Sequence, residues 1–546
     1  MIDTPDTSAT IASKDKLARS ESWQDSKAEK GDSRHVEAHA IPVDTHDMYE
    51  GDDSAVDPVY HAKAHILNDA FQEIGMGKYQ WYLFMVAGFG WFSDNLWPVA
   101  TGLILDPVVN EFAVQGPYLR LAQSIGLLVG AAFWGTASDV WGRKWCFNIT
   151  LLITGVFAVA AGGSPNFVVL CSLTAVWNVG VGGNLPVDSA VFLASHQYLL
   201  TVLSIWWAFG QLVGSLVAWP LIADFSCASA ANCPRSSNQG WRYFLYAMGG
   251  LMLLLFVLRF FVFHMYESPK YLMGRGRDVE AVEVVHRVAA YNRRTSTLTL
   301  EMLQDVETRL GKSVAPGRAA FETSAKAAVL RKMQTFAGSH VKGLFATTKL
   351  AYSTTLLIIV WALIGLAFSL YSGFIPFFLA TRGADFGDGS VYITYRNQVI
   401  LSVIGVPGAL LAGWMVELPY LGRKGTLAIS TTLPALVITG VFLFASTTSR
   451  TSNALLGWNC GYTFTSNVMY GVLYAVSPEL FPTKNRGTGN AIVASASRVF
   501  GSMAPIIALK ANLATSVPIW VAGALFLVAG SISLLLPFES RGRASI

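Results

Sequence analysis

Twelve apolar blocks of about 20 residues each, the length needed to cross a bilayer as a helix, restrict the fold of this chain more than any other feature. They lie at 82–104, 118–137, 145–162, 167–187, 199–224 and 241–264, and then at 351–380, 397–417, 426–446, 453–476, 488–509 and 515–537. A soluble protein could not bury so many, and 53% of the residues are apolar against 14% charged. The sequence therefore predicts an all-α membrane protein with twelve transmembrane helices.

The blocks form two sets of six, separated by polar sequence. We expect an N-terminal half at 81–264, a cytoplasmic central segment at 265–350, a C-terminal half at 351–538 and a short cytoplasmic tail at 539–546. The run DVEAVEVVHRVAAY in the central segment has apolar residues at helical spacing, which predicts short amphipathic surface helices. Residues 1–80 are polar and show no cleavable signal peptide, so we expect a disordered cytoplasmic tail there.

The distribution of Lys and Arg predicts the orientation, because basic residues near helix ends resist translocation. Fourteen of them lie in the central segment, whereas the loops at 105–117 and 163–166 have none. Both termini and the central segment are therefore expected in the cytoplasm, with the plasma membrane as the membrane crossed. The net charge of +4 is not gathered into a basic stripe, which excludes nucleic acid as a partner.

Two of the five cysteines, Cys227 and Cys233, lie in a loop that helix parity places outside, where an oxidising compartment permits a disulfide. A disulfide and two free thiols are both compatible with this position. No group of His, Cys or acidic residues has metal-ligand spacing. Neither a nucleophile elbow nor a phosphate-binding glycine loop occurs, so the sequence predicts no enzyme and no cofactor.

The loop between the second and third blocks carries the clearest motif, GTASDVWGRK, with Gly135, Asp139, Gly142 and Arg143. A glycine permits close helix packing, and an acid at a helix end can pair with a facing helix terminus. The Gly-Arg-Lys turn holds the loop in cytoplasmic water. A topological stop signal would account for the basic residues alone.

The same pattern returns between the eighth and ninth blocks as GWMVELPYLGRK, with Glu417, Gly422 and Arg423. A loop duplicated at equivalent places in two six-helix halves is typical of transporters whose halves rock about a central site. The sequence here resembles the major facilitator superfamily, whose loop signature is this pattern. The resemblance implies a gating role for the residues of both loops.

Further motifs narrow the resemblance, which covers about residues 70–540. Glu267 in YESPKYLMGRGR, and Glu479 and Arg486 in SPELFPTKNRGTGN, are similar to sugar-porter-like signatures, and we assign these residues to the gate. The runs GWFSDNLW and VGVGGNLPVD resemble the branch of synaptic-vesicle-glycoprotein-like proteins and nicotinate or aromatic-acid carriers, which has many fungal members. The chain departs from that branch at Ala194–His196, where an acidic, proline-containing turn is usual. Either the cytoplasmic clamp is weakened or a few codons are missing.

Asp94 lies about midway along the first block, with no basic residue within one helical turn. A buried carboxylate in a bilayer is costly, and it could bind and release a proton near neutral pH. A structural acid bonded to a neighbouring helix, or an acid near a water-filled mouth, are the alternatives. We predict that Asp94 couples transport to a proton.

Arg498 lies near the middle of the eleventh block, on one face with Ser495 and Ser502. Because arginine stays charged, it requires an anion, a cluster of carbonyl groups or water. It can be the counter-ion of an acid such as Asp94, or it can bind the carboxylate of an anionic substrate through two hydrogen bonds. An arginine that snorkels to the interface is the third alternative.

Polar and aromatic residues at helical spacing mark the sides of other helices that face a cavity. We assign substrate binding to Arg498 and to five of these residues, namely Asn178, Trp207, Gln211, Asn467 and Tyr470. Hydrogen bonds between helices would account for any one of them without a ligand. Together they predict a polar pocket with aromatic walls, suited to a sugar, a polyol or a small aromatic acid.

These features predict a monomeric carrier that moves a small polar organic solute together with a proton, inward across the plasma membrane. Arg498 favours an organic anion as the solute, whereas the sugar-porter-like motifs favour a sugar or polyol. An exporter of metabolites or drugs is compatible with the same features. A non-transporting sensor on the same fold would use the long tail and the central segment to bind partners.

Overall fold

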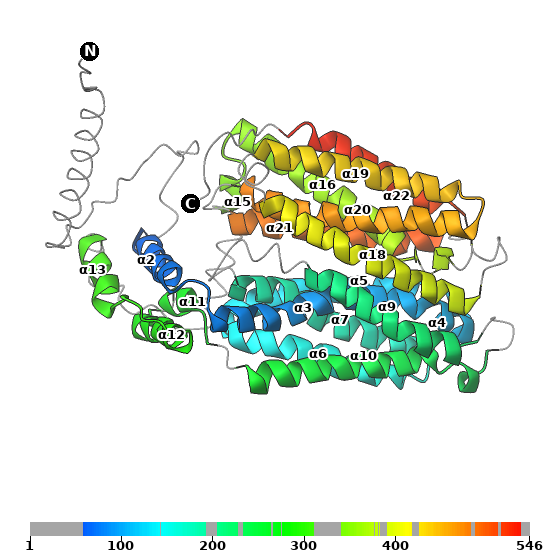
Figure 1. The fold of residues 1–546 in the computed structure, drawn as a ribbon, viewed down its shortest axis with the longest axis horizontal. Helices are drawn as coiled ribbons and strands as arrows, with labels where there is room; N and C mark the ends of the chain where they lie inside the picture. Colours follow the sequence, from blue (N-terminus) through cyan, green and yellow to red (C-terminus); the bar gives the residue numbers. More distant parts are fainter. Residues whose placement is uncertain are drawn as a thin grey trace, which may run out of the picture. The chain divides into compact units, whose positions relative to one another are not determined.

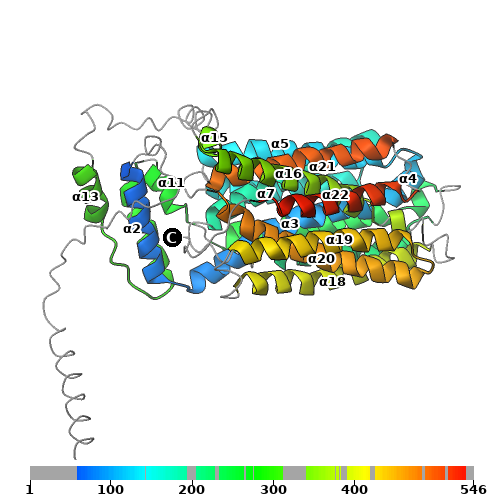
Figure 2. The same ribbon diagram turned by 90° about the horizontal axis from the view of Figure 1, so that it is seen from above.

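The computed structural model describes residues 58–141, 143–192, 205–227, 233–263, 266–274, 276–310, 340–375, 377–379, 382, 390–417, 425–481, 486–510 and 515–536. All of them belong to one unit of the chain, Asp53–Ile546. Within these ranges the regular secondary structure is helical and contains no strand (Figures 1 and 2).

Six long helices form the N-terminal half, and each lies close to a predicted block. They are α3 (Lys78–Leu103), α5 (Pro117–Trp141), α6 (Arg143–Gly162), α7 (Phe167–Phe192), α9 (Ile205–Phe225) and α10 (Gly240–Val257). Helix α7 packs against α3, α5 and α6, while α9 packs against α3 and α10 (Figure 1). A short helix, α4 (Leu105–Phe112), follows α3 at the end of the bundle where α5 begins.

Two glycines one helical turn apart bring α5 close to α7. A Cβ atom on Gly126 would lie 2.2 Å from the carbonyl oxygen of Ala175, and one on Gly130 would lie 2.2 Å from that of Val179. Small residues of this kind let helices pack in a bilayer, where lipid tails are as apolar as the helices and give no hydrophobic drive to association. The close approach lets Trp134 Nε1 donate a hydrogen bond to Val179 O at 3.0 Å.

The C-terminal half also has six long helices near the predicted blocks. They are α16 (Thr348–Ser372), α18 (Val391–Glu417), α19 (Gly425–Thr447), α20 (Ser452–Glu479), α21 (Arg486–Lys510) and α22 (Val517–Ser533). Helix α16 packs against α21 and α22, and α20 packs against α18 and α19. Between the halves, α9 packs against α18 and α5 against α21. The predicted all-α architecture of two six-helix halves is confirmed.

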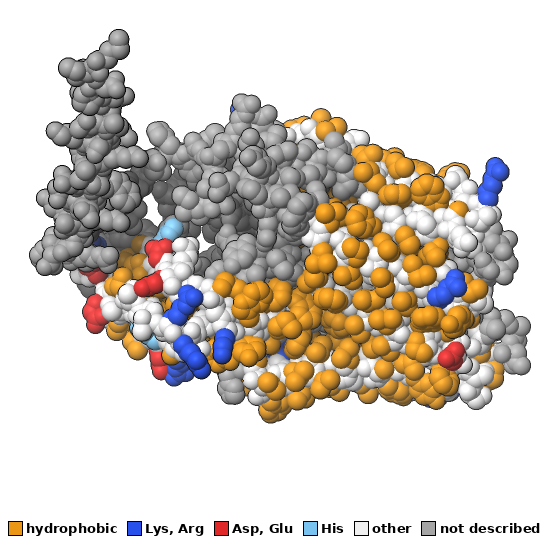
Figure 3. Space-filling model, in the orientation of Figure 1, with side chains coloured by type: hydrophobic (Ala, Val, Ile, Leu, Met, Phe, Trp, Pro, Cys, Tyr) orange, Lys and Arg blue, Asp and Glu red, His pale blue; other side chains and the backbone are white. Residues whose placement is uncertain are grey.

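The hydrophobic stretches of the sequence coincide with long helices of the structure. Among the described residues, six helices are long and apolar enough to cross a membrane: Lys144–Gly162, Phe167–Asn184, Ile205–Phe225, Gly240–Val262, Thr348–Ser372 and Gly489–Lys510. Several of the other long helices carry polar side chains that face the interior, such as Asp94 on α3 and Asn467 on α20. On the face shown in Figure 3, hydrophobic side chains cover the bundle and charged ones gather toward its ends. A helical bundle surrounded by lipid requires this distribution.

Four short helices form a cap at the end of the bundle where α3 begins (Figure 1). Helix α2 (Pro58–Ile74) packs against α11 (Pro269–Gly274), α12 (Asp278–Tyr291) and α13 (Leu300–Leu310). The buried Lys63 of α2 forms an ion pair with the partly buried Asp278 of α12. The central segment thus contains short helices, and α12 covers the run DVEAVEVVHRVAAY, with Ala281, Val285 and Val288 among its buried residues.

The tail differs from the sequence-based prediction. The expectation of disorder throughout 1–80 is wrong for α2, which buries Leu67, Phe71 and Ile74 in the cap. These side chains lie at helical spacing, but their burial depends on apolar partners in α12 and α13 that are distant in the sequence. Residues 1–57, the turn at Ala194–His196 and the tail at 539–546 lie outside the described residues.

Candidate functional site

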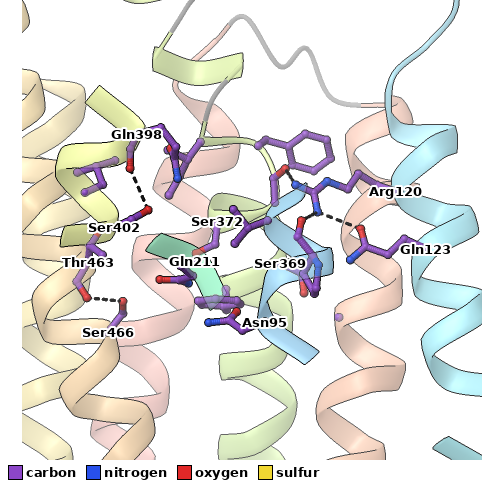
Figure 4. Close-up of a pocket in the computed structure, with 18 of the residues that line it drawn as sticks. Asn95, Arg120, Gln123, Gln211, Ser369, Ser372, Gln398, Ser402, Thr463 and Ser466 are labelled. Carbon is purple, nitrogen blue, oxygen red and sulfur yellow. Dashed lines mark hydrogen bonds between the residues drawn. The ribbon is translucent and has the colours of Figure 1, made fainter. Parts of the chain in front are cut away.

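A central cavity lies between the two halves, which both contribute to its walls. Its distal segment, toward α4, has a volume of about 200 Å³. Figure 4 labels several of the polar residues that line this segment, namely Asn95, Arg120, Gln123, Gln211, Ser369, Ser372, Gln398, Ser402, Thr463 and Ser466. The proximal segment, toward the cap, has a volume of about 210 Å³ and shares Asn95, Gln211 and Ser466 with the distal one. The two segments therefore form one continuous chamber.

In the proximal segment, Asp94 of α3 faces Arg498 of α21. Arg498 Nη2 is 3.8 Å from Asp94 Oδ1, which is too long for a hydrogen bond but close enough for electrostatic attraction. Arg498 Nη1 also donates to Leu127 O on α5 and to Gly182 O on α7, each at 3.2 Å. The sequence left the partner of Arg498 open, and the structure places it beside Asp94. One guanidinium thus connects the C-terminal half to three helices of the N-terminal half.

Aromatic rings join the halves on the cap side of the cavity. The ring of Trp207 on α9 lies 5.0 Å from that of Tyr474 and 6.3 Å from that of Tyr470, both on α20. Trp361 of α16 also contacts Tyr474, with 4.9 Å between ring centroids. Edge-to-face contacts of this kind add specific attraction to the burial of large apolar surfaces.

Hydrogen bonds also join the halves on the α4 side. Arg120 Nη2 of α5 donates to Gly373 O at the end of α16. The Tyr395 hydroxyl of α18 donates to Leu103 O at the end of α3. The cavity therefore lies between two layers of contacts that must break in turn if each side is to open.

Four of the residues assigned to substrate binding by helical spacing line the proximal segment, namely Trp207, Gln211, Asn467 and Tyr470. Asn178 does not line either segment. It is buried on α7 at the contact with α5, and its amide donates to Thr174 O at 2.8 Å. A polar stripe on α7 therefore marks a contact between helices rather than the cavity, which is the alternative explanation of such stripes.

Sequence reasoning missed several residues of the distal segment, above all Arg120 and Gln123 on α5 and Gln398 and Ser402 on α18. Arg120 lies near the start of the second apolar block, where an arginine resembles an interfacial residue. The available signal was the spacing of three or four residues that puts each pair on one face of its helix.

Of the predicted gate residues, Glu267 has a described side chain. Its Oε2 accepts a hydrogen bond from Lys144 N at 3.4 Å, at the start of α6, where the helix dipole favours an anion. This contact connects the YESP motif to the Gly-Arg-Lys loop. The side chains of the other predicted gate residues lie outside the described part of the structure: Gly135, Asp139, Gly142, Arg143, Glu417, Gly422, Arg423, Glu479 and Arg486.

A buried ion pair holds the α4 end of the N-terminal half together. Glu111 of α4 accepts hydrogen bonds from Arg242 Nη1 at 2.8 Å and Nη2 at 2.6 Å, from Trp241 Nε1 at 2.9 Å and from Asn238 Nδ2 at 3.0 Å. Burial by itself would raise the pKa of Glu111, but the hydrogen bonds from Arg242, Trp241 and Asn238 outweigh it and hold the pKa below its usual 4.5.

The loop after α9 at the same end contains a disulfide bond between Cys227 and Cys233, with Cα atoms 5.6 Å apart. In the part of the chain that the structure describes, no three His, Cys, Asp or Glu side chains lie close enough together to hold a metal ion.

Comparison with known proteins gives consistent results. Residues 80–505 match the Major Facilitator Superfamily. The chain is 60% identical to MFS siderochrome iron transporter 1 of Ceriporiopsis subvermispora, over 92% of this chain and 95% of that one. It is 28% identical to Niacin transporter NiaP of Acinetobacter baylyi, over 80% of this chain and 88% of that one. The fold is similar to the xylose transporter XylE from E. coli in a partially occluded inward-open conformation, with TM-score 0.62 and 15% identity, over 85% of this chain and 99% of that chain.

Proposed function

Because the chain belongs to the Major Facilitator Superfamily, whose members are membrane transporters and not enzymes, we propose that it moves a small organic anion together with a proton by alternating access. The observation that carries this proposal is the Asp94–Arg498 pair in a cavity that both halves line. Family membership itself confirms the predicted fold, the multi-pass membrane location and the class of protein.

A proton and Arg498 compete for the carboxylate of Asp94, and this competition couples solute binding to proton binding. A charged Asp94 attracts Arg498, whereas a protonated Asp94 leaves the guanidinium without its counter-ion. Arg498 then supplies an uncompensated positive charge to the cavity wall, which favours an anionic solute. Proton binding and anion binding therefore strengthen each other, as reciprocal linkage requires.

The cavity walls suit a small solute with a flat or apolar body. Trp207 and Tyr470 offer aromatic faces, while Gln211 and Asn467 offer hydrogen-bond donors and acceptors. The two segments, of about 200 Å³ and 210 Å³, overlap, so the chamber that they form lies at the small end of ligand pockets, which measure about 300–1,000 Å³, and suits a small solute. Niacin, named for the bacterial relative, is an aromatic carboxylate of this kind.

A ferric siderochrome is the second candidate solute, because the relative that is 60% identical bears that name. Such a chelate is much larger than a small aromatic acid, so the cavity would have to widen considerably to admit it. The motifs YESPKYLMGRGR and SPELFPTKNRGTGN still favour a sugar as a candidate solute. The likeness to XylE adds no support for a sugar, because it concerns the fold alone. We also propose uptake by a monomer across the plasma membrane, with both termini in the cytoplasm.

The test is uptake into liposomes that contain the full-length protein, with an inward proton gradient and a panel of labelled nicotinate, xylose and a ferric siderochrome. We expect nicotinate to accumulate, and a protonophore to abolish the accumulation. Asp94→Asn should lose gradient-driven accumulation but keep exchange of solute for solute, because it has no proton to release. Asp224→Asn makes the same chemical change at an exposed acid of α9 and should behave as the wild type does.

Accumulation of nicotinate by Asp94→Asn at the wild-type ratio would remove that residue as the coupling site. Proton-driven accumulation of the siderochrome alone would favour the second candidate, and accumulation of xylose alone would favour a sugar. Absence of uptake or exchange for every solute would favour a sensor on the same fold.

A further inference from the structure

Arg120 is a buried cation at the distal end of the cavity. It lies on α5, with 6% of its surface exposed, and it lines the distal segment beside Gln123 (Figure 4). The other arginine of the cavity, Arg498, has a carboxylate at 3.8 Å. None of the described residues places a carboxylate within ion-pair distance of Arg120.

Neutral oxygens are the hydrogen-bond partners of Arg120. Its Nη1 donates to Pro98 O at 2.6 Å and to Gln123 Oε1 at 3.0 Å, and its Nη2 donates to Gly373 O. The buried Nε has no acceptor among the described residues. A guanidinium has five N–H donors, so three bonds leave two donors unused, including Nε–H. The side chain therefore carries both an unbalanced charge and unused donors.

The backbone around Arg120 leaves room for this arrangement. A Cβ atom on Gly102 of α3 would lie 2.1 Å from Arg120 Nη2. Glycine at position 102 thus allows the guanidinium to reach both the α3 carbonyl of Pro98 and the α16 carbonyl of Gly373. Dipoles of neutral carbonyl groups reduce the cost of a buried charge, and a carboxylate would add an opposite charge and two parallel charge-assisted hydrogen bonds.

We infer that Arg120, held by Gln123 and by the space at Gly102, is the binding site for the carboxylate group of the transported solute. This inference rests on the proposed function and specifies it: the solute is a monocarboxylate whose charged end lies in the distal segment. Arg498 differs because it is engaged with Asp94 until a proton arrives, whereas Arg120 is available before and after protonation. The carboxylate of the solute would compete with Gly373 O for the guanidinium of Arg120. Binding at this site would therefore weaken a hydrogen bond between the halves.

The test measures binding to the purified full-length protein by calorimetry, with nicotinate and its uncharged amide, nicotinamide, as probes. The two probes share ring and size, so their difference isolates the carboxylate. Arg120→Gln should weaken nicotinate binding by about tenfold or more and leave nicotinamide binding unchanged, since a charge-assisted hydrogen bond is lost. The affinity of Arg120→Lys for nicotinate should lie between those of the wild type and of Arg120→Gln, because an ammonium group keeps the charge but cannot form two parallel hydrogen bonds. Arg235→Gln removes an exposed arginine from the loop near the same end and should bind both probes as the wild type does.

Gly102→Ala provides a variant that keeps the charge. The added methyl group must displace the guanidinium, so this variant should also lose preference for nicotinate over nicotinamide. Equal weakening of both probes by Arg120→Gln would indicate a structural role and overturn the inference, as would unchanged binding of nicotinate. A wild-type protein that binds nicotinate no more tightly than nicotinamide would overturn it too.

Asp94→Asn separates this inference from the proposed function. That variant should keep its preference for nicotinate, because Arg120 does not touch Asp94, while it loses proton-driven accumulation. Retained accumulation in Asp94→Asn, combined with lost preference in Arg120→Gln, would refute proton coupling at Asp94 and leave the carboxylate site in place.

Discussion

Replacement of Glu111 by glutamine should destabilise the α4 end of the protein far more than loss of an exposed ion pair. The Glu111 and Arg242 side chains are 6% and 2% exposed, and Glu111→Gln would leave the Arg242 guanidinium buried without its counter-ion. Removing one partner of a buried pair costs about 3–5 kcal/mol. The neighbouring ring of Trp241, 4.1 Å from Arg242 Cζ, remains as a weaker partner, so we expect the lower end of that range.

The control is Glu283→Gln on α12, which removes an i, i+4 partner of Arg287. Both side chains of this pair are 55% exposed, and such pairs contribute about 0.3–0.5 kcal/mol. Unfolding of both variants in mixed SDS micelles, followed by tryptophan fluorescence, compares the two losses directly. A Glu111→Gln variant no less stable than Glu283→Gln would refute the reasoning.

The same pair predicts a pH dependence. Because its folded-state pKa is lowered from the usual 4.5, Glu111 stabilises the folded state fully above that usual value. The stabilisation is lost as the pH falls through the lowered folded-state pKa. The stability difference between the wild type and Glu111→Gln should therefore be constant from pH 6 to 8, by the same linkage, and shrink in strong acid. A difference that does not shrink in acid would show that the charge of Glu111 contributes little.

Three further predictions concern other parts of the chain. Mass spectrometry of the non-reduced protein should show the Cys227 and Cys233 peptides linked, and free thiols at both positions would contradict the disulfide. Asp139→Asn and Glu417→Gln should each lower uptake with normal expression, by shifting the conformational equilibrium by about 1–2 kcal/mol; unchanged uptake in both variants and in the double variant would leave the loops as topology signals. Arg498→Lys should weaken anion binding, because an ammonium group cannot make both hydrogen bonds, to Leu127 O and Gly182 O, that fix the positive charge at the cavity wall. Binding of a sugar with wild-type affinity by that variant would move the substrate assignment away from anions.

Much of the architecture follows from local sequence. In lipid every backbone N–H and C=O group must be paired within the chain, so each apolar block has to be a helix, and block positions translate directly into helices such as α3 and α16. The Gly-Arg-Lys loop occurs twice, at equivalent places in the two sets of six blocks. This repetition indicated two related halves, and the loop pattern itself indicated the family. Helical spacing also placed Trp207, Gln211, Asn467 and Tyr470 on faces that line the cavity.

The sequence alone therefore determined the number and order of the helices, the two-half organisation and the depth of Asp94, since each depends on residues within one block. Only the tertiary structure decided which side chains meet. It placed Arg498 beside Asp94, turned Asn178 toward a helix contact and buried Arg120 against Gly373 of the other half. It also folded α2, whose apolar face needs partners in the central segment. The physical reason is that the rotation of a helix about its axis, and the neighbour that it faces, depend on packing between distant segments, which no local pattern encodes.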